Sequence, residues 1–261
     1  MSNRPFRKCR LCLEERNLCN SHLLPAGVFK ILRAPHLKNP NPVFLSDRHA
    51  FTTARQVQDY LLCDECEQRF SDRGERWVLG HCYRAESDFK IREALLRSKP
   101  ALHGEGVSMY AGATVPEVDV DQLTYFGLSV FWRAAVHTWQ DAAGPVRIEL
   151  GPYEERLRLF LLDKESFPAR MTYAVRISGL KRLLQTCWLP ESENHDGFHT
   201  HQFSVPGVVF GLLAGARIPA DHFRFCTARS PERFISIVPE LDARIISAAA
   251  EKVQKAQNRM R

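Results

Sequence analysis

The chain has 261 residues, of which 44% are hydrophobic. This is enough apolar material for a sizeable core, so the composition excludes a disordered protein and predicts one large domain, or a small domain followed by a larger one. Lysine and arginine exceed aspartate and glutamate by 36 to 30, a net charge of +6. This charge suits a polyanionic partner, although an ordinary basic soluble protein explains it equally well.

The basic segment at residues 1–8 is not followed by an apolar stretch, so we expect no secretory signal. The longest apolar runs, at 157–162 and 205–213, are far shorter than the roughly 18 residues that a membrane span needs. We therefore expect a cytoplasmic protein.

Two Cys-x-x-Cys pairs, Cys9/Cys12 and Cys63/Cys66, mark the first third of the chain. Four thiolates complete a tetrahedral shell around Zn²⁺, and a tight turn already holds the two members of each pair together. In the reducing cytosol such pairs more often bind metal than form disulfides. The spacing therefore predicts a structural zinc site. The other cysteines are scattered singly and are expected to be small buried apolar side chains: Cys19, Cys82, Cys187 and Cys226.

Residues 1–85 are predicted to form the zinc-binding unit. Between the two cysteine pairs, a stretch rich in proline and asparagine at 35–42 predicts an irregular loop, and residues 55–62 predict a strand that runs into Cys63. The polar segment at 67–76 then favours a helix. The expected order is a knuckle, a hairpin-like segment, a second knuckle and a helix.

Residues 86–261 are predicted to form a larger α+β domain, because helices come first and antiparallel strands later. Its central element is a long apolar helix at 120–143, which begins with a capping box of Asp119 and Gln122. A loop rich in small residues, at 103–116, precedes it. Further helices are expected at 87–97, from 152 onward and at 241–253, and strands at 171–177, 201–205, 208–212, 223–226 and 234–238.

One combination in the first third is more specific than the knuckles alone. A cysteine pair is followed by a histidine with two leucines and a proline, and then by two leucines before a second pair that opens a helix: Cys9, Cys12, His22, Leu23, Leu24, Pro25, Leu61, Leu62, Cys63 and Cys66. This pattern resembles the zinc-stapled HNH endonucleases of the ββα-metal, treble-clef class. The resemblance implies a treble-clef zinc domain, His22 as the general base acting on a water, and a divalent ion, Mg²⁺ or Mn²⁺, that polarises the scissile phosphate. It also implies a prokaryotic setting such as defence against phage.

The sequence departs from this family where ligands of the catalytic metal are expected. Ser21 precedes His22, where the family has Asp or His, and the helix after the last cysteine lacks the family's histidine. Glu67 and Glu75 are candidate substitutes, on one helix face with Ser71, because carboxylates bind Mg²⁺ and Mn²⁺ well. The alternative is a solvated acidic helix face beside a structural histidine. Two more carboxylates are further candidates: Asp64 and Asp72.

We therefore expect a metal-dependent endonuclease that hydrolyses DNA, with His22, Glu67 and Glu75 at its catalytic site and residues 86–261 recognising the substrate or a protein partner. The alternative is a catalytically inactive, zinc-stabilised module that binds nucleic acid or protein. Basic side chains near both ends are the expected phosphate contacts, unless they serve solubility alone: Arg4, Arg7, Lys8, Arg10, Lys252, Lys255, Arg259 and Arg261.

A histidine-rich segment at 195–201 is a second candidate. If it is extended, His199 and His201 lie on one face of a strand and could share an ion or a phosphate. No cysteine or carboxylate pair is spaced to complete a metal shell, so an exposed polar loop is favoured instead.

Overall fold

The computed structural model describes residues 4–33, 43–45, 50–52, 56–141, 144–181 and 186–239. Two predictions lie outside these ranges, the irregular loop at 35–42 and the C-terminal helix with its basic tail at 241–261. Within them the fold is mixed α+β, as predicted. None of the described helices combines the length and the apolar character needed to cross a membrane.

A three-stranded sheet in the order β1-β2-β5 carries the two cysteine pairs. Both neighbouring pairs of strands are antiparallel, and β5 is the strand that was predicted to run into Cys63. Helix α1 follows β2, and the short hairpin of β3 and β4 precedes β5 in the chain. The bounds are β1 (Phe6–Lys8), β2 (Glu15–His22), α1 (Ala26–Leu32), β3 (Val43–Leu45), β4 (Ala50–Thr52) and β5 (Gln58–Cys63).

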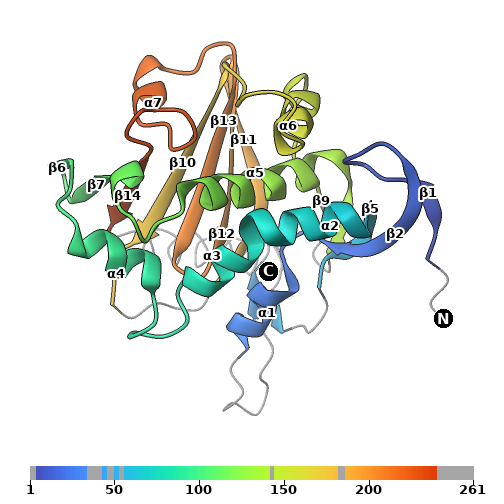
Figure 1. Cartoon of the computed structure of the whole chain (residues 1–261), viewed down its shortest axis with the longest axis horizontal. Coiled ribbons are helices and arrows are strands. Elements are labelled where there is room, and N and C mark those ends of the chain that lie inside the picture. Colours follow the sequence, from blue (N-terminus) through green and yellow to red (C-terminus); the bar gives the residue numbers. More distant parts are fainter. Residues whose placement is uncertain are drawn as a thin grey trace, which may run out of the picture.

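The rest of the chain is built on a seven-stranded sheet in the order β11-β12-β13-β10-β14-β7-β6 (Figure 1). Its neighbouring strands are antiparallel, except that β10 and β14 run parallel. Four of the predicted strands are found, as β10, β12, β13 and β14. The bounds are β6 (Leu102–Gly104), β7 (Val107–Ala111), β10 (Met171–Ser178), β11 (Trp188–His195), β12 (Phe198–Val205), β13 (Val208–Gly215) and β14 (Phe234–Val238).

Three predictions for this sheet are wrong. The expected loop at 103–116 contains β7, which becomes a strand because it pairs with β14 and buries Tyr110 opposite Ile235. The expected polar loop at 195–201 is the turn and second strand of the β11–β12 hairpin. The expected strand at 223–226 instead covers the end of a short helix, α7 (Ala220–Arg224), and the two residues after it; this helix has an acidic residue, Asp221, in its first turn.

Helix α5 (Val120–Val136) is the central helix of the fold. The predicted N-cap is confirmed, since the backbone N–H of Gln122 donates to Oδ1 of Asp119 at 2.9 Å. The reciprocal bond differs from that of a capping box, because the Gln122 side-chain amide donates to Oδ2 of the Asp119 side chain, at 2.8 Å. The helix ends at Val136 rather than near 143, because the chain turns into a hairpin of β8 (Trp139–Asp141) and β9 (Gly144–Val146). There the buried Trp139 indole donates to the carbonyl of Arg133, 2.8 Å away. Two further helices match their predicted positions: α4 (Lys90–Arg97) and α6 (Tyr153–Leu161).

The chain from 64 to 81 forms a continuous helical rod, longer at both ends than the predicted 67–76. It consists of α2 (Asp64–Phe70), a π-helical turn (Ser71–Glu75) and α3 (Arg76–His81). In the π turn the N–H of Arg76 donates to the carbonyl of Ser71, five residues back instead of four. Single π turns of this kind occur frequently at functional sites.

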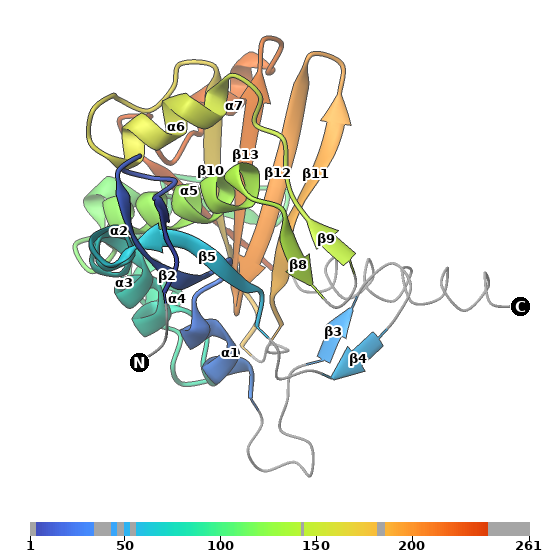
Figure 2. The ribbon, with the colours of Figure 1, turned by 90° about the vertical axis from the view of Figure 1, so that its right-hand side faces the viewer.

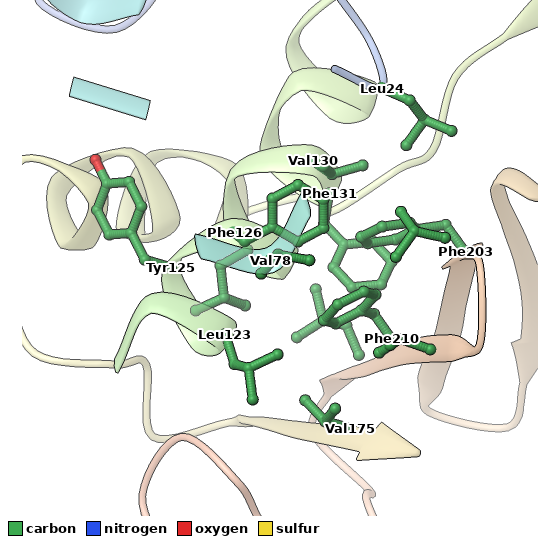
Figure 3. Packing of buried hydrophobic residues seen from close by; sticks show 14 of the residues in the cluster. Leu24, Val78, Leu123, Tyr125, Phe126, Val130, Phe131, Val175, Phe203 and Phe210 are labelled. Carbon is green, nitrogen blue, oxygen red and sulfur yellow. The ribbon is translucent and has the colours of Figure 1, made fainter. Parts of the chain in front are cut away.

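Helix α5 lies between the seven-stranded sheet and the helical rod (Figure 2). On the sheet side, Phe126 and Phe131 pack edge to face against Phe203, with ring centroids 6.1 and 5.0 Å apart (Figure 3). On the other side, Phe70 of the rod packs against Trp132 at 6.0 Å. One buried cluster runs through both sides, so it is continuous across the predicted boundary at residue 85. The division into 1–85 and 86–261 stays a prediction.

Gly74 allows the helical rod to approach the backbone of α5. A Cβ at this position would lie 2.8 Å from the amide nitrogen of Phe126 and 2.9 Å from the carbonyl oxygen of Gln122, and backbone atoms cannot move aside as a side chain can. We expect Gly74→Ala to lower the free energy of unfolding by about 1–3 kcal/mol, the usual cost of overpacking.

Gly80 provides a matched control on the same rod. A Cβ there would meet no atom within 4 Å, so Gly80→Ala should stabilise the protein by about 0.5–1 kcal/mol through helix propensity. Urea unfolding of both variants measures the two effects. Equal changes of the same sign would show that the close approach at Gly74 is unimportant.

Candidate functional site

The four cysteines of the two knuckles come together at one point. Cys9 and Cys12 lie between β1 and β2, Cys63 ends β5, and Cys66 lies in the first turn of α2. Their sulfur atoms all lie within 4.8 Å of one another, and those of Cys12 and Cys63 are 4.0 Å apart. A tetrahedral site with Zn–S bonds of about 2.3 Å has sulfur atoms about 3.8 Å apart. The predicted tetrad therefore fits a metal ion such as zinc.

Backbone hydrogen bonds hold the two knuckles in shape independently of a metal ion. The N–H of Cys9 donates to the carbonyl of Glu14 at 2.8 Å, and the N–H of Leu13 donates to the carbonyl of Cys9 at 3.0 Å. Leu13 takes a φ of 66°, a left-handed conformation that closes the first knuckle. The N–H of Cys63 donates to Sγ of Cys9 at 3.4 Å, which joins the second knuckle to the first.

The thiols of the tetrad differ in how readily they ionise. A hydrogen bond with Cys66 lowers the pKa of Cys9 to about 4. Burial, and then the neighbouring Cys9 sulfur, raise the pKa of Cys12 to about 11. The hydrogen bond with Cys9 likewise raises the pKa of Cys66. Metal binding at this site must therefore displace protons from Cys12 and Cys66.

The four single cysteines stand apart from the tetrad. Cys82 and Cys226 are buried, as predicted, whereas Cys19 and Cys187 are half-buried. The thiol of Cys19 donates to Oδ1 of Asp64 at 3.1 Å, and Asp64 also pairs with Arg4 at 2.7 Å. Arg4 is thus engaged with a carboxylate, while three other candidates for phosphate contact are exposed: Arg7, Lys8 and Arg10.

A pocket of about 450 Å³ lies between the end of β2, the start of α1 and the helical rod. His22, Glu67 and Glu75, the three residues predicted to be catalytic, all line it, and so does Asp64. Asp72 is not among its lining residues. Its carboxylate accepts a hydrogen bond from Gln68 and pairs with Arg76, at 2.7 and 2.8 Å.

Among the pocket residues that the sequence interpretation missed, the most heavily bonded is Arg133 of α5. Its side chain is 1% exposed, and it pairs with Oε1 of Glu75 at 2.8 Å. Its other terminal nitrogen donates to the backbone carbonyl of His22, also at 2.8 Å. An arginine within an otherwise apolar helix stretch was the available signal, because a buried cation needs a carboxylate or carbonyl partner.

Burial favours the neutral form of both Glu75 and His22. Burial raises the pKa of the Glu75 carboxyl, and the Arg133 guanidinium acts against this effect. For His22, burial is the main cause of a lowered pKa, and Arg133 lowers it further. Since the unperturbed pKa is 6.5, His22 is neutral at physiological pH and its ring can accept a proton.

The Glu67 side chain gives the clearest indication that the pocket binds a ligand. Its Oε1 atom is shielded from solvent and has no hydrogen-bond partner among the described residues. A buried carboxylate oxygen without a partner is costly, and a cation or a proton relieves that cost. Within the described ranges, however, the cysteine tetrad is the only group of three or more His, Cys, Asp or Glu residues whose ligand atoms lie close enough together to hold a metal ion.

The second histidine group does not form a comparable site. His199 and His201 share one face of β12, as predicted, with nearly parallel rings 6.1 Å apart. His201 is fully buried, its Nδ1 lies 2.7 Å from Oγ of Ser192, and burial lowers its pKa to about 4. It is therefore a neutral histidine in the core of the sheet.

No protein family model, no curated protein and no solved structure matches this chain. The resemblance to the HNH endonucleases thus rests on the residue pattern of the first third alone.

Proposed function

We propose that this protein is a metal-dependent endonuclease that hydrolyses phosphodiester bonds of DNA. The observation that carries the proposal is the shared pocket. His22 comes from a strand, Glu67 and Glu75 come from the helical rod that also contains Cys66, and all three line one cavity. A neutral imidazole beside carboxylates supplies a base and potential metal ligands, the two things that hydrolysis of a phosphodiester requires.

In this reaction a water oxygen bonds to phosphorus while the bond to the leaving oxygen breaks, and His22 accepts the proton that the water loses. Glu67 and Glu75 are the residues that would hold Mg²⁺ or Mn²⁺, which neutralises charge on the phosphate when it is bound. Mg²⁺ is commonly held by one or two carboxylates together with substrate phosphates. A site of two glutamates, completed only by the substrate, is consistent with the absence of a third gathered ligand in the described ranges.

We propose that the tetrad binds a structural Zn²⁺ within a treble-clef domain at 1–85. In the reducing cytoplasm its thiols would stay available for the metal. Zinc would fix the end of β5 against the start of α2, and so fix Asp64 and Glu67 beside His22. Residues 86–261 would recognise the DNA or a protein partner.

A specific observation favours a second function, a zinc-stabilised module that binds nucleic acid or protein without cutting. Glu75 is already paired with Arg133, so one of the two proposed ligands is partly neutralised. If the Glu75–Arg133 ion pair does not open to admit a metal ion, the protein binds nucleic acid or protein but does not hydrolyse DNA.

Supercoiled plasmid separates the two functions. The protein, dialysed free of loosely bound divalent ions, is incubated with plasmid and Mg²⁺, Mn²⁺ or neither, and conversion to the open circle is measured. We expect metal-dependent nicking by the wild type, its loss in His22→Ala, and its retention in His199→Ala, which changes a histidine outside the pocket. DNA binding without nicking by the wild type would instead establish the binding module.

A further inference from the structure

Arg133 connects three separate segments of the chain. Its guanidinium, on α5, donates to the His22 carbonyl on β2 and to Glu75 on the helical rod, each at 2.8 Å. It is also 3.5 Å from Oγ of Ser129 on its own helix. These bonds use both terminal nitrogens of a planar, fork-shaped cation, a geometry that lysine cannot reproduce.

The position of the guanidinium is fixed by packing. Its central carbon lies 5.3 Å from the ring centroid of Phe70, a fully buried residue of α2. The carbonyl of Arg133 is held in turn by the indole of Trp139. The buried side chain lines the pocket, and it contacts the backbone of one proposed catalytic residue and the carboxylate of another.

We propose that Arg133 is a positioning residue that sets the place of His22 relative to Glu75, so that the pocket is completed by the larger part of the chain. As a statement about catalysis, this inference rests on the proposed function. It assigns α5 a role beyond packing, because the His22 strand and the Glu75 helix are joined through a cation that neither segment supplies.

The test compares two arginine-to-lysine variants of the full-length protein. Arg133→Lys keeps the charge but removes the forked contact. Arg233→Lys is the control, because Arg233 also binds a carboxylate, Asp121, and a backbone carbonyl, that of Thr227. Through Asp121, Arg233 contacts the start of α5, whereas Arg133 is near the end of that helix. Arg233 does not line the pocket. Thermal melting gives the stability of both variants.

On a short fluorescent DNA duplex, we expect Arg133→Lys to lower kcat roughly 10- to 100-fold, the effect of misplacing a reacting group by about 1 Å. KM should change little, and the acid limb of the pH profile should stay near its wild-type position because lysine keeps the positive charge that lowers the pKa of His22. Arg233→Lys should keep the wild-type kcat and pH profile even if it melts earlier. Wild-type kinetics in Arg133→Lys would overturn the inference.

A second readout does not depend on cleavage. The titration of the His22 ring is followed by NMR in the wild type, Arg133→Lys and Arg133→Met. Loss of the cation should raise the His22 pKa, because Arg133 lowers it in the native protein. If the wild type does not cut DNA but the titration shifts in Arg133→Met, the nuclease proposal fails, while the close approach of the Arg133 cation to His22, on which the positioning role depends, is established. A titration that stays unchanged in folded Arg133→Met overturns the inference, because that variant removes the cation.

Discussion

Cys63→Ser should abolish stoichiometric metal binding and unfold the N-terminal unit. In small zinc modules the metal contributes about 10–16 kcal/mol of apparent folding free energy at pH 7, and serine does not replace a thiolate ligand. Cys63 also bonds to Cys9 through its backbone and leads directly into α2. Because the buried cluster is shared with α5, loss of this unit should also expose the Phe70 side of that helix.

Two measurements check this expectation, the metal content per chain and the melting temperature with and without a chelator. A loss of only about 4 kcal/mol would lower the Tm by roughly 10 °C, at about 2–4 °C per kcal/mol for a chain of this size class. Cys19→Ser is the matched control, since Cys19 lies on the same sheet but bonds to Asp64, outside the tetrad. Equal metal content in Cys63→Ser and the wild type would exclude the tetrad as the binding site.

The cysteine tetrad and the acidic pocket could be predicted from the sequence because their signals are local. A Cys-x-x-Cys pair specifies its own turn, and the spacing of Glu67 and Glu75 within one predicted helix indicates a shared face. The strand containing His22 then needs only to pair with the strand that ends at Cys63, as β2 and β5 do.

Arg133 could not be placed in the same way. Its contact with His22 spans 111 residues of sequence, and it forms in a fold where α5 also packs closely against the helical rod at Gly74. The misassigned elements have a similar cause. Strand β11 is polar from Glu191 to His195, and β7 lies within a stretch, 103–116, that is rich in small residues. Pairing with neighbouring strands therefore makes them strands more than the composition of these stretches does.

His22→Ala should lower kcat/KM for DNA cleavage by about 10²- to 10⁴-fold, the usual contribution of a positioned general base. The active form of His22 is the neutral ring. Burial, and then Arg133, lower its pKa below the ordinary 6.5, so protonation should become significant only at more acidic pH. Wild-type kcat/KM should therefore be constant near neutrality and fall on the acid side, with a midpoint below 6.5.

The acid limb is what separates a base from a merely structural histidine. In His22→Ala the limb should disappear, and added imidazole should restore part of the rate, because a free base can enter the pocket that the side chain vacates. Glu67→Gln offers a contrasting variant in the same pocket. It should raise the Mg²⁺ concentration needed for half-maximal rate and leave the acid midpoint in place, since it removes a metal ligand and not the base. An acid limb that survives in His22→Ala would assign the proton transfer to another group.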